Sequence, residues 1–497
     1  MTALLPDVAL FIHRVLGSNV VFLRMMSTGR VGWREAVPRQ VAIPISKRIS
    51  EMTATAWPRS LICVHQLVRG VTAIGLLLGT TPTFAQTEEN TLLVWAGDKA
   101  HEAPDFLAVV DFDSNSPHYG KIIRIVPLPA AKLGSGAVGN EPHHAGLSSD
   151  ARTVALGGLL SFLRHQPQVF FFDVTHPRHP KFISANNPPN ASITDEFVPL
   201  TAGGFLGTFM GGPAGAHPGR VVEYDSNMNV VRTLPVPADD AQHMFNPHGI
   251  AIDEANNLMV TSDYVCPVST LHVGGGVPHF DGSIRVWDLA KRSIIRTIDV
   301  GDHVGTMDVK LIPGDALHRA FTAGMDDHQL YLVDTQTGTA RAVFDFGPYA
   351  VQAVPEPPIW PQELMINKAG TRLFVILNFA GQAGKVVMLD ISDPERPQAV
   401  GADPDAGVVD LGLNSGPHYP RLTSDEKRLV VSDYFLVEDL IPGGVINAEG
   451  DMKVHVINVF SDHLELDTHF NLDFNHDVAT GPARPHALIV LHGQGDD

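Results

Sequence analysis

A repeated two-strand phrase constrains this chain more than any other feature of its sequence. From residue 86 onward, short β-favouring runs recur, each followed by Asp or Asn and a turn. Five of them align: VFFFDVTHPRHPKFI, IRVWDLAKRSIIRTI, LYLVDTQTGTARAVF, VVMLDISDPERPQAV and VHVINVFSDHLELDT. Each reads as strand, turn, strand, which is typical of a β-hairpin. The repetition therefore predicts an all-β chain built from similar units.

An inner pair of strands precedes each hairpin, and the starts of these pairs can be counted. They fall near His144, Leu200, His248, Met307, Glu363 and His418, at intervals of 48 to 59 residues. A period of this size indicates four strands per repeat, as in the blades of a propeller.

The two ends of the repeat region complete one another. RPHALIVL at 484–491 has no outer strands after it, whereas TLLVWAGD, FLAVVDF and KIIRIVPL near residue 91 have no inner strand before them. Joined, they form a seventh blade without open sheet edges. We therefore expect residues 86–497 to form a single seven-bladed β-propeller, closed by pairing of the C-terminal strand with the N-terminal blade.

Residues 1–85 differ in character from the rest. They carry nine Lys or Arg against three acids, which leaves 26 basic and 51 acidic side chains in the remainder. Such an acidic body argues against a nucleic-acid partner. The stretch LVRGVTAIGLLLGTTPTFAQ has the basic, apolar and small-residue regions of a secretory signal, with cleavage after Ala85. An N-terminal membrane anchor is the alternative, although the apolar run is shorter than a membrane span.

This leader predicts a periplasmic or secreted protein with no membrane attachment in its mature form. Met52 gives a signal of ordinary length, so residues 1–51 are expected to be a misassigned start. Removal of the leader removes Cys63 and leaves Cys266 alone, so the mature chain is expected to have no internal disulfide.

Histidines occupy corresponding positions in several repeats. The phrase GPHYPRLTSDEKRLVVSDY echoes NPHGIAIDEANNLMVTSDY, and Pro-His also occurs in EPHHAGLSSD and RPHALIV. The innermost strands of a propeller start around one mouth of its channel, so we expect their first residues to meet there. The histidines concerned are His143, His144, His248, His418 and His486. Two other strand starts supply the acids Asp308 and Glu363.

Converging neutral imidazoles predict a transition-metal site. Copper, zinc, iron and nickel favour imidazole, whereas calcium and magnesium favour oxygen ligands. We expect three or four of the five histidines to bind one metal and the others to support it. The alternative is that these histidines only hydrogen-bond backbone carbonyls in the channel.

The chain from about 91 to 491 also resembles a known family, through EPHHAG, GSIRVWDLAKRSIIRTIDVG, LMINKAGTRLFVILNFAGQAGKVVMLDISDPERPQAVG and LDFNHDVATGPARPHAL. These stretches resemble the selenium-binding protein and methanethiol oxidase family, of which the chain looks like a divergent member. The resemblance implies a seven-bladed propeller and, for bacterial members, a periplasmic copper enzyme with His143, His144 and His486 at the copper-associated positions. A family histidine expected near 197–202 is missing, since FVPLTAGG offers only Thr201, and we expect His418 to compensate.

The implied function is a copper-dependent oxidase of small thiols, in which thiol, oxygen and water give an aldehyde, hydrogen sulfide and hydrogen peroxide. Glu363 or Asp308 would serve as general base or orient a ligand imidazole. Two alternatives stay open: a non-catalytic metal- or ligand-binding propeller, and a propeller enzyme of the NHL-like kind, such as a lactonase or lyase. Fold alone does not choose among them.

Overall fold

The computed structural model describes residues 89–492 except 237–243, 268–279, 351–359, 379–382, 402, 404 and 440–446. The chain separates into two compact units, residues 1–85 and 86–497. The first unit lies outside the described residues, so the secretory signal, its cleavage after Ala85 and the fate of Cys63 stay predictions. Within the described ranges, no helix combines the length and apolar character needed to cross a bilayer.

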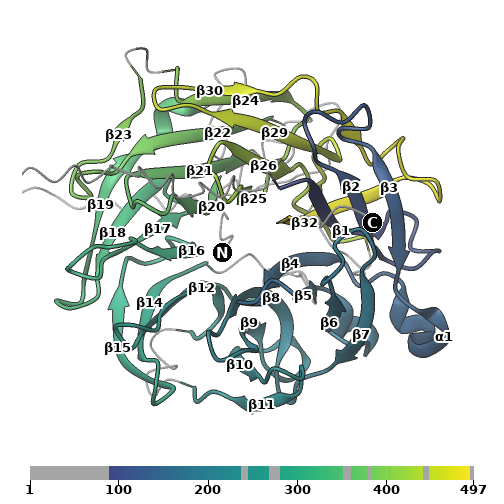
Figure 1. The fold of residues 1–497 in the computed structure, drawn as a ribbon. Helices are drawn as coiled ribbons and strands as arrows, with labels where there is room; N and C mark the ends of the chain where they lie inside the picture. Colours follow the sequence, from purple (N-terminus) through teal and green to yellow (C-terminus); the bar gives the residue numbers. More distant parts are fainter. Residues whose placement is uncertain are drawn as a thin grey trace, which may run out of the picture. The chain divides into compact units, whose positions relative to one another are not determined.

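The described residues between 89 and 492 form a ring of seven antiparallel sheets (Figure 1). Blade 1 contains β1 (Thr91–Asp98), β2 (Phe106–Asp111), β3 (Ile122–Pro127) and β32 (Ala483–Leu491). Blade 2 contains β4 (Pro142–Leu147), β5 (Thr153–Gly158), β6 (Val169–Asp173) and β7 (Lys181–Asn186). Blade 3 contains β8 (Ser192–Pro199), β9 (Phe205–Gly211), β10 (Arg220–Tyr224) and β11 (Val230–Thr233).

The remaining blades follow the same plan. Blade 4 contains β12 (Pro247–Asp253), β13 (Leu258–Val265), β14 (Phe280–Asp288) and β15 (Ser293–Asp299), and blade 5 contains β16 (Thr306–Leu311), β17 (Ala320–Gly324), β18 (Gln329–Asp334) and β19 (Thr339–Asp345). Blade 6 contains β20 (Trp360–Ile366), β21 (Arg372–Asn378), β22 (Ala383–Asp390), β23 (Gln398–Ala399) and β24 (Val408–Leu413). Blade 7 contains β25 (Tyr419–Leu422), β26 (Arg428–Ser432), β29 (Lys453–Val459), β30 (Leu464–Leu466) and β31 (Leu472–Asp473). The predicted all-β propeller is confirmed.

Short elements decorate the ring. A small sheet pairs β27 (Leu436–Val437) with β28 (Asn447–Ala448), and the described α-helix is the single turn α1 (Ala130–Leu133). Among the described residues, 3-10 turns span Gly134–Ala137, Ser161–Arg164, Pro213–Gly215 and Gly347–Tyr349.

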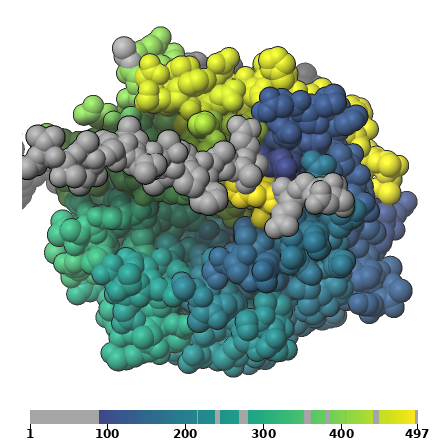
Figure 2. Space-filling view, viewed as in Figure 1, coloured from purple at the N-terminus to yellow at the C-terminus, as the bar shows by residue number. Residues whose placement is uncertain are grey.

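The ring is closed by the strand predicted to close it. β32 is the inner strand of blade 1 and pairs with β1 from Thr91↔Leu491 to Asp98↔Ala483. All eight residues of β1 are buried, and Leu488 on β32 is fully buried beside them. Figure 2 shows residues of both chain ends, purple-blue and yellow, in the same sector of the surface. Because β32 supplies an inner strand, the C-terminus is an integral part of the fold.

A β-bulge recurs near the start of the inner strands and determines which side chains face the channel. Such a bulge adds one residue to its strand and re-aims the neighbouring side chains. The register shifts span Pro142/Ala145, Thr194/Phe197, Pro247/Ile250, Thr306/Val309 and Pro361/Leu364, and β1 shifts at Trp95/Ala96 opposite β32. The repeated bulge therefore lets adjacent residues, such as His143 and His144, both face the axis.

The bulges also correct one predicted strand start. The inner strand of blade 3 was expected to start near Leu200, but β8 runs from Ser192 to Pro199 and Leu200 follows its end. The residues at the bulge are Asp195 and Glu196. The prediction was wrong because this strand lacks the Pro-His pair that identifies the start in blades 2, 4, 7 and 1.

Candidate metal centre

The structure brings all five predicted histidines together. Each of them is at most 2% exposed. One nitrogen from each of His143, His144, His418 and His486 lies within 4.8 Å of the other three. A nitrogen of His248, a nitrogen of His143 and a carboxylate oxygen of Asp195 also lie within 4.8 Å of one another. Side chains from four blades therefore form one buried cluster.

The adjacent His143 and His144 reach the cluster because of the bulge after Pro142. Neighbouring residues of a regular strand face opposite sides, so both can approach one ion only where the backbone turns. The register shift between Pro142 and Ala145 provides that turn. The two imidazoles stack with their centroids 4.3 Å apart and their planes 9° from parallel.

His144 and His418 face each other at the middle of the cluster, with Nε2 atoms 3.1 Å apart. His418 Nδ1 lies 2.8 Å from the side-chain oxygen of Gln362, and His144 Nδ1 lies 2.9 Å from Asp195 Oδ1. An amide oxygen accepts hydrogen bonds, so His418 Nδ1 carries the hydrogen. His144 Nδ1 and Asp195 Oδ1 form no aligned hydrogen bond, but the negative charge of the carboxylate favours a hydrogen on His144 Nδ1. The two Nε2 atoms therefore present lone pairs to each other, an arrangement that a shared cation stabilises.

The distance between these nitrogens agrees with shared metal ligation. Metal–imidazole bonds of about 2.0–2.1 Å separate neighbouring ligands by roughly 2.9 Å in square-planar geometry and 3.3 Å in tetrahedral geometry. The observed separation of 3.1 Å lies between these values.

Several buried polar atoms of the centre have no hydrogen-bond partner among the described residues. They are both ring nitrogens of His486, Nδ1 of His143, His144 and His248, both carboxylate oxygens of Asp195, Nε2 of Gln362 and Oε1 of Glu363. Buried polar groups are normally paired, with protein or water. A set of four imidazoles suits copper or zinc, and we conclude that the residues present fit such a metal.

Burial keeps the cluster in its ligating form. Burial lowers the pKa of His144, His418 and His486 well below the usual value, and neighbouring imidazoles lower it further. Burial also lowers the pKa of His248, against the opposing charge of Asp195. Neutral imidazole is the form that binds metals.

Asp195, like Gln362, is a residue of the centre that the sequence did not identify. It is fully buried, 3.2 Å from His248 Nε2 and 3.6 Å from His143 Nε2, besides its approach to His144. Burial opposes its ionisation, but His248 and His144 outweigh burial and hold its pKa well below the usual range. Its position, 52 residues after His143 and 53 before His248, is the signal that could have identified it.

The predicted acids, Glu363 and Asp308, belong to a buried ionic network beside the histidines. Glu363 Oε1 is 3.8 Å from His144 Nε2, and burial together with the charge of Asp308 raises the pKa of Glu363 well above its usual value. Asp308 Oδ1 is 2.8 Å from Lys310 Nζ, its Oδ2 accepts the Leu364 N–H at 3.0 Å, and Lys310 also contacts Glu196 at 2.7 Å. Glu363 thus faces the centre directly, whereas a catalytic role for Asp308 stays a prediction.

The echoed Ser-Asp-Tyr phrase anchors the turns that carry two of the histidines. Asp263 Oδ1 accepts the N–H of Asn246 at 3.0 Å, two residues before His248. Asp433 Oδ1 accepts the N–H of Gly416, two residues before His418. The phrase recurs because the equivalent aspartates, Asp263 and Asp433, hold equivalent Pro-His turns in blades 4 and 7.

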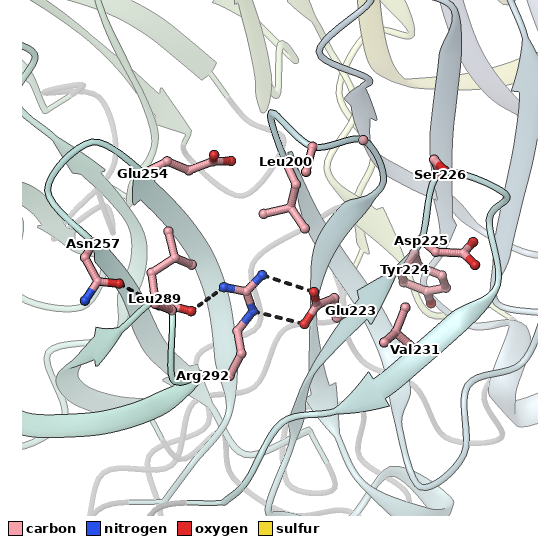
Figure 3. Close-up of a pocket in the computed structure, with 13 residues that line it drawn as sticks. Leu200, Glu223, Tyr224, Asp225, Ser226, Val231, Glu254, Asn257, Leu289 and Arg292 are labelled. Atoms are coloured by element: carbon pink, nitrogen blue, oxygen red, sulfur yellow. Dashed lines mark hydrogen bonds and ion pairs between the residues drawn. The ribbon is translucent and has the colours of Figure 1, made fainter.

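A surface pocket of about 440 Å³ lies elsewhere, between turns of blades 3 and 4 (Figure 3). It contains none of the five histidines. Its Arg292 forms two 3.0 Å contacts with Glu223, so these opposite charges already neutralise each other. The pocket is therefore not part of the candidate centre.

Comparisons with known proteins agree with the predicted resemblance. Residues 80–496 match the family described as 56kDa selenium binding protein (SBP56). The chain is 23% identical to methanethiol oxidase of Rattus norvegicus and 24% identical to that of Bos taurus, over 78% of this chain and 89% of each relative.

Solved structures show the same fold. A hypothetical selenium-binding protein from Sulfolobus tokodaii aligns with a TM-score of 0.64 at 19% identity, covering 82% of this chain and 95% of that one. A periplasmic gluconolactonase from Pseudomonas aeruginosa aligns with a TM-score of 0.55 at 11% identity, covering 81% and 99%. At such identities these likenesses concern the fold alone. The family match, which spans most of the chain, shows that this protein belongs to the 56kDa selenium binding protein family.

Proposed function

We propose that this protein is an exported, copper-dependent oxidase of small thiols, of the kind named in its methanethiol oxidase relatives. One observation carries the proposal: the Nε2 atoms of His144 and His418 face each other at 3.1 Å, while Gln362 accepts a hydrogen bond from His418 Nδ1 and the Asp195 carboxylate lies 2.9 Å from His144 Nδ1. In this arrangement His143, His144, His418 and His486 hold the metal, and Asp195 and Gln362 orient two of them.

Bound copper supplies one-electron redox chemistry and lowers the pKa of a coordinated thiol. The chain contributes orientation, because the hydrogen bond of Gln362 to His418 Nδ1 and the Asp195 carboxylate beside His144 Nδ1 fix the directions of these two imidazoles. It also contributes neutral ligands, since burial holds the imidazole pKa values low.

The surroundings of the centre favour a small apolar substrate. A buried apolar cluster, which includes Met210, Met307 and Met325, lies against it. Phe435 of this cluster has its ring 4.7 Å from that of His418, and the ring of Tyr264 is 5.1 Å from that of His248. Such buried apolar surroundings keep bulk water from the centre and suit a small apolar thiol, of which methanethiol is an example.

Glu363 is positioned to move a proton. Burial and the charge of Asp308 raise the pKa of Glu363 well above its usual value, and its Oε1 lies 3.8 Å from the ligand nitrogen of His144. The overall reaction converts thiol, oxygen and water to an aldehyde, hydrogen sulfide and hydrogen peroxide. For methanethiol the aldehyde is formaldehyde, and the atoms balance.

The test is to measure copper content by elemental analysis and oxygen uptake with methanethiol on the mature protein. His144→Ala and His486→Ala should abolish both while the near-ultraviolet circular dichroism stays unchanged. The matched control is His469→Ala, because the His469 side chain is 92% exposed. Stoichiometric copper without oxygen uptake would instead identify a non-catalytic metal binder, and lactone hydrolysis without copper would identify a lactonase.

Export is tested separately, by mass spectrometry of protein from its native host. The expected mature N-terminus is Gln86, as the pattern before it predicts. An intact leader on the folded protein would contradict the periplasmic or secreted location and leave the thiol oxidase proposal standing.

A further inference from the structure

A second group of ligand-type side chains lies in blade 7 and shares no residue with the histidine centre. Asp433 follows β26, Asp451 precedes β29, and His455 lies within β29. One potential ligand atom from each lies within 4.8 Å of the other two. The Asp433 side chain is fully buried, whereas those of Asp451 and His455 are 18% and 13% exposed. The group is thus buried on one side and open to solvent on the other.

The distances in this group are too long for hydrogen bonds. His455 Nε2 is 3.4 Å from Asp433 Oδ2 and 3.6 Å from Asp451 Oδ1. Charge-assisted N–H···O bonds measure about 2.7–2.9 Å. Neither His455 Nε2 nor Asp433 Oδ2 has a hydrogen-bond partner in the described part of the chain. Ligands at about 2.0–2.2 Å from a tetrahedral cation lie roughly 3.3–3.6 Å apart, which matches both separations.

In blade 4, the aspartate equivalent to Asp433 is neutralised by neighbouring side chains. Asp263 occupies the position of Asp433, and its Oδ2 accepts bonds from Arg285 Nε at 2.5 Å and Ser283 Oγ at 2.7 Å. The strand registers place His455 where Arg285 lies, because Thr261 pairs with Arg285 and Val431, at the position equivalent to Thr261, pairs with His455. Histidine is shorter than arginine, and His455 Nε2 stops 3.4 Å from Asp433 Oδ2, a separation that a bridging cation can span.

We propose that Asp433 Oδ2, Asp451 Oδ1 and His455 Nε2 bind a divalent cation of the zinc type. One imidazole and two carboxylates suit zinc, whereas calcium takes oxygen ligands only. The partial exposure of Asp451 and His455 gives the ion a path of entry and leaves the fourth position to water. Lys453 Nζ contacts Asp451 Oδ2 at 2.7 Å, whereas Oδ1 accepts one hydrogen bond, from the Lys453 N–H at 2.9 Å, and keeps a second lone pair for the ion.

This second site has a structural role in the chain. Asp433 uses its other oxygen, Oδ1, to accept the N–H of Gly416, and Gly416 belongs to the turn that carries His418. A cation on Oδ2 would fix the Asp433 carboxylate and, with it, this turn. The proposed ion therefore supports the position of His418 from outside the histidine centre.

The experiment measures zinc in a protein that lacks the first centre. The His144→Ala/His486→Ala double variant of the full mature chain is incubated with zinc sulfate, desalted and analysed for zinc. We expect about one zinc per chain more in this protein than in the same protein carrying His455→Arg. That substitution recreates the pair formed by Asp263 and Arg285 in blade 4, so it should preserve the fold while removing the ligand.

Two further measurements keep the proposal refutable. Asp451→Asn retains an oxygen that accepts the Lys453 N–H at 2.9 Å, so it should fold normally and bind zinc at least about tenfold more weakly. Hydrogen exchange at Gly416 should slow when zinc is added to the double variant and stay unchanged with His455→Arg. His469→Ala should alter neither quantity.

Equal zinc content with and without His455→Arg, or unchanged affinity in Asp451→Asn, would overturn the proposal and show that a protonated His455 alone neutralises Asp433. If His455→Arg fails to fold, the zinc affinity of Asp451→Asn decides the question. Because these residues lie outside the histidine centre, a failure of thiol oxidation leaves this test unaffected.

Discussion

Replacing Asp195 by Asn tests the geometry of the histidine centre most directly. The substitution keeps the size of a fully buried side chain but removes its negative charge. That charge lies 2.9 Å from His144 Nδ1 and 3.2 Å from His248 Nε2. An amide can still accept one hydrogen bond, but it stabilises the bound cation less and fixes His144 less firmly.

The expected magnitude follows from these contacts. Loss of a carboxylate that orients a ligand imidazole typically weakens metal binding 10- to 100-fold, or by about 1.4–2.8 kcal/mol. A unit charge about 4 Å from another is worth about 4 kcal/mol at an effective dielectric constant near 20, so the lost charge suffices for this range.

The assay is competition for copper against a chromophoric chelator, together with the electron paramagnetic resonance spectrum of the copper-loaded protein. Asp195→Asn should weaken binding by the stated factor and alter the spectrum, while the control Asp462→Asn, whose side chain is 76% exposed, should change neither. An affinity within about twofold of wild type, in a folded variant, would refute the orienting role of Asp195.

Three further predictions concern closure, pH dependence and catalysis. Leu488→Ala, at a fully buried position of the closing strand, should lower the free energy of unfolding by about 2–5 kcal/mol in urea titrations. The control Leu413→Ala, at a site 74% exposed, should change it little. A small loss of stability in Leu488→Ala would contradict closure by β32. Burial raises the pKa of Asp105 to about 7, so the contribution of Asp105 to stability is full below about pH 4 and is lost as the pH rises through about 7. Relative to Asp105→Asn, the free energy of unfolding of the wild type should fall by about 3 kcal/mol between pH 5 and pH 8. A difference between the two proteins that does not change with pH would refute this prediction. Glu363→Gln should lower the rate of thiol oxidation about 10²- to 10⁴-fold with copper content unchanged, and an unchanged rate would exclude proton transfer by Glu363.

Much of this architecture follows from local patterns. Alternating apolar residues and turn residues specify each hairpin, and a period near 55 residues specifies four strands per blade. Closure was predictable because the two ends lack complementary strands, and an unpaired inner edge is unfavourable. The five histidines were predictable because proline precedes or neighbours each of them at the start of an inner strand.

Only the tertiary structure decided how these side chains meet. A bulge adds one residue without altering the apolar pattern, so the sequence does not reveal that Asp195, and not a residue near Leu200, enters the channel. The contact of Gln362 with His418 joins two blades and exists only because the ring places them side by side. Likewise, Asp433 and His455 meet through the register of β26 and β29, which depends on pairing between strands and not on the order of residues within either one.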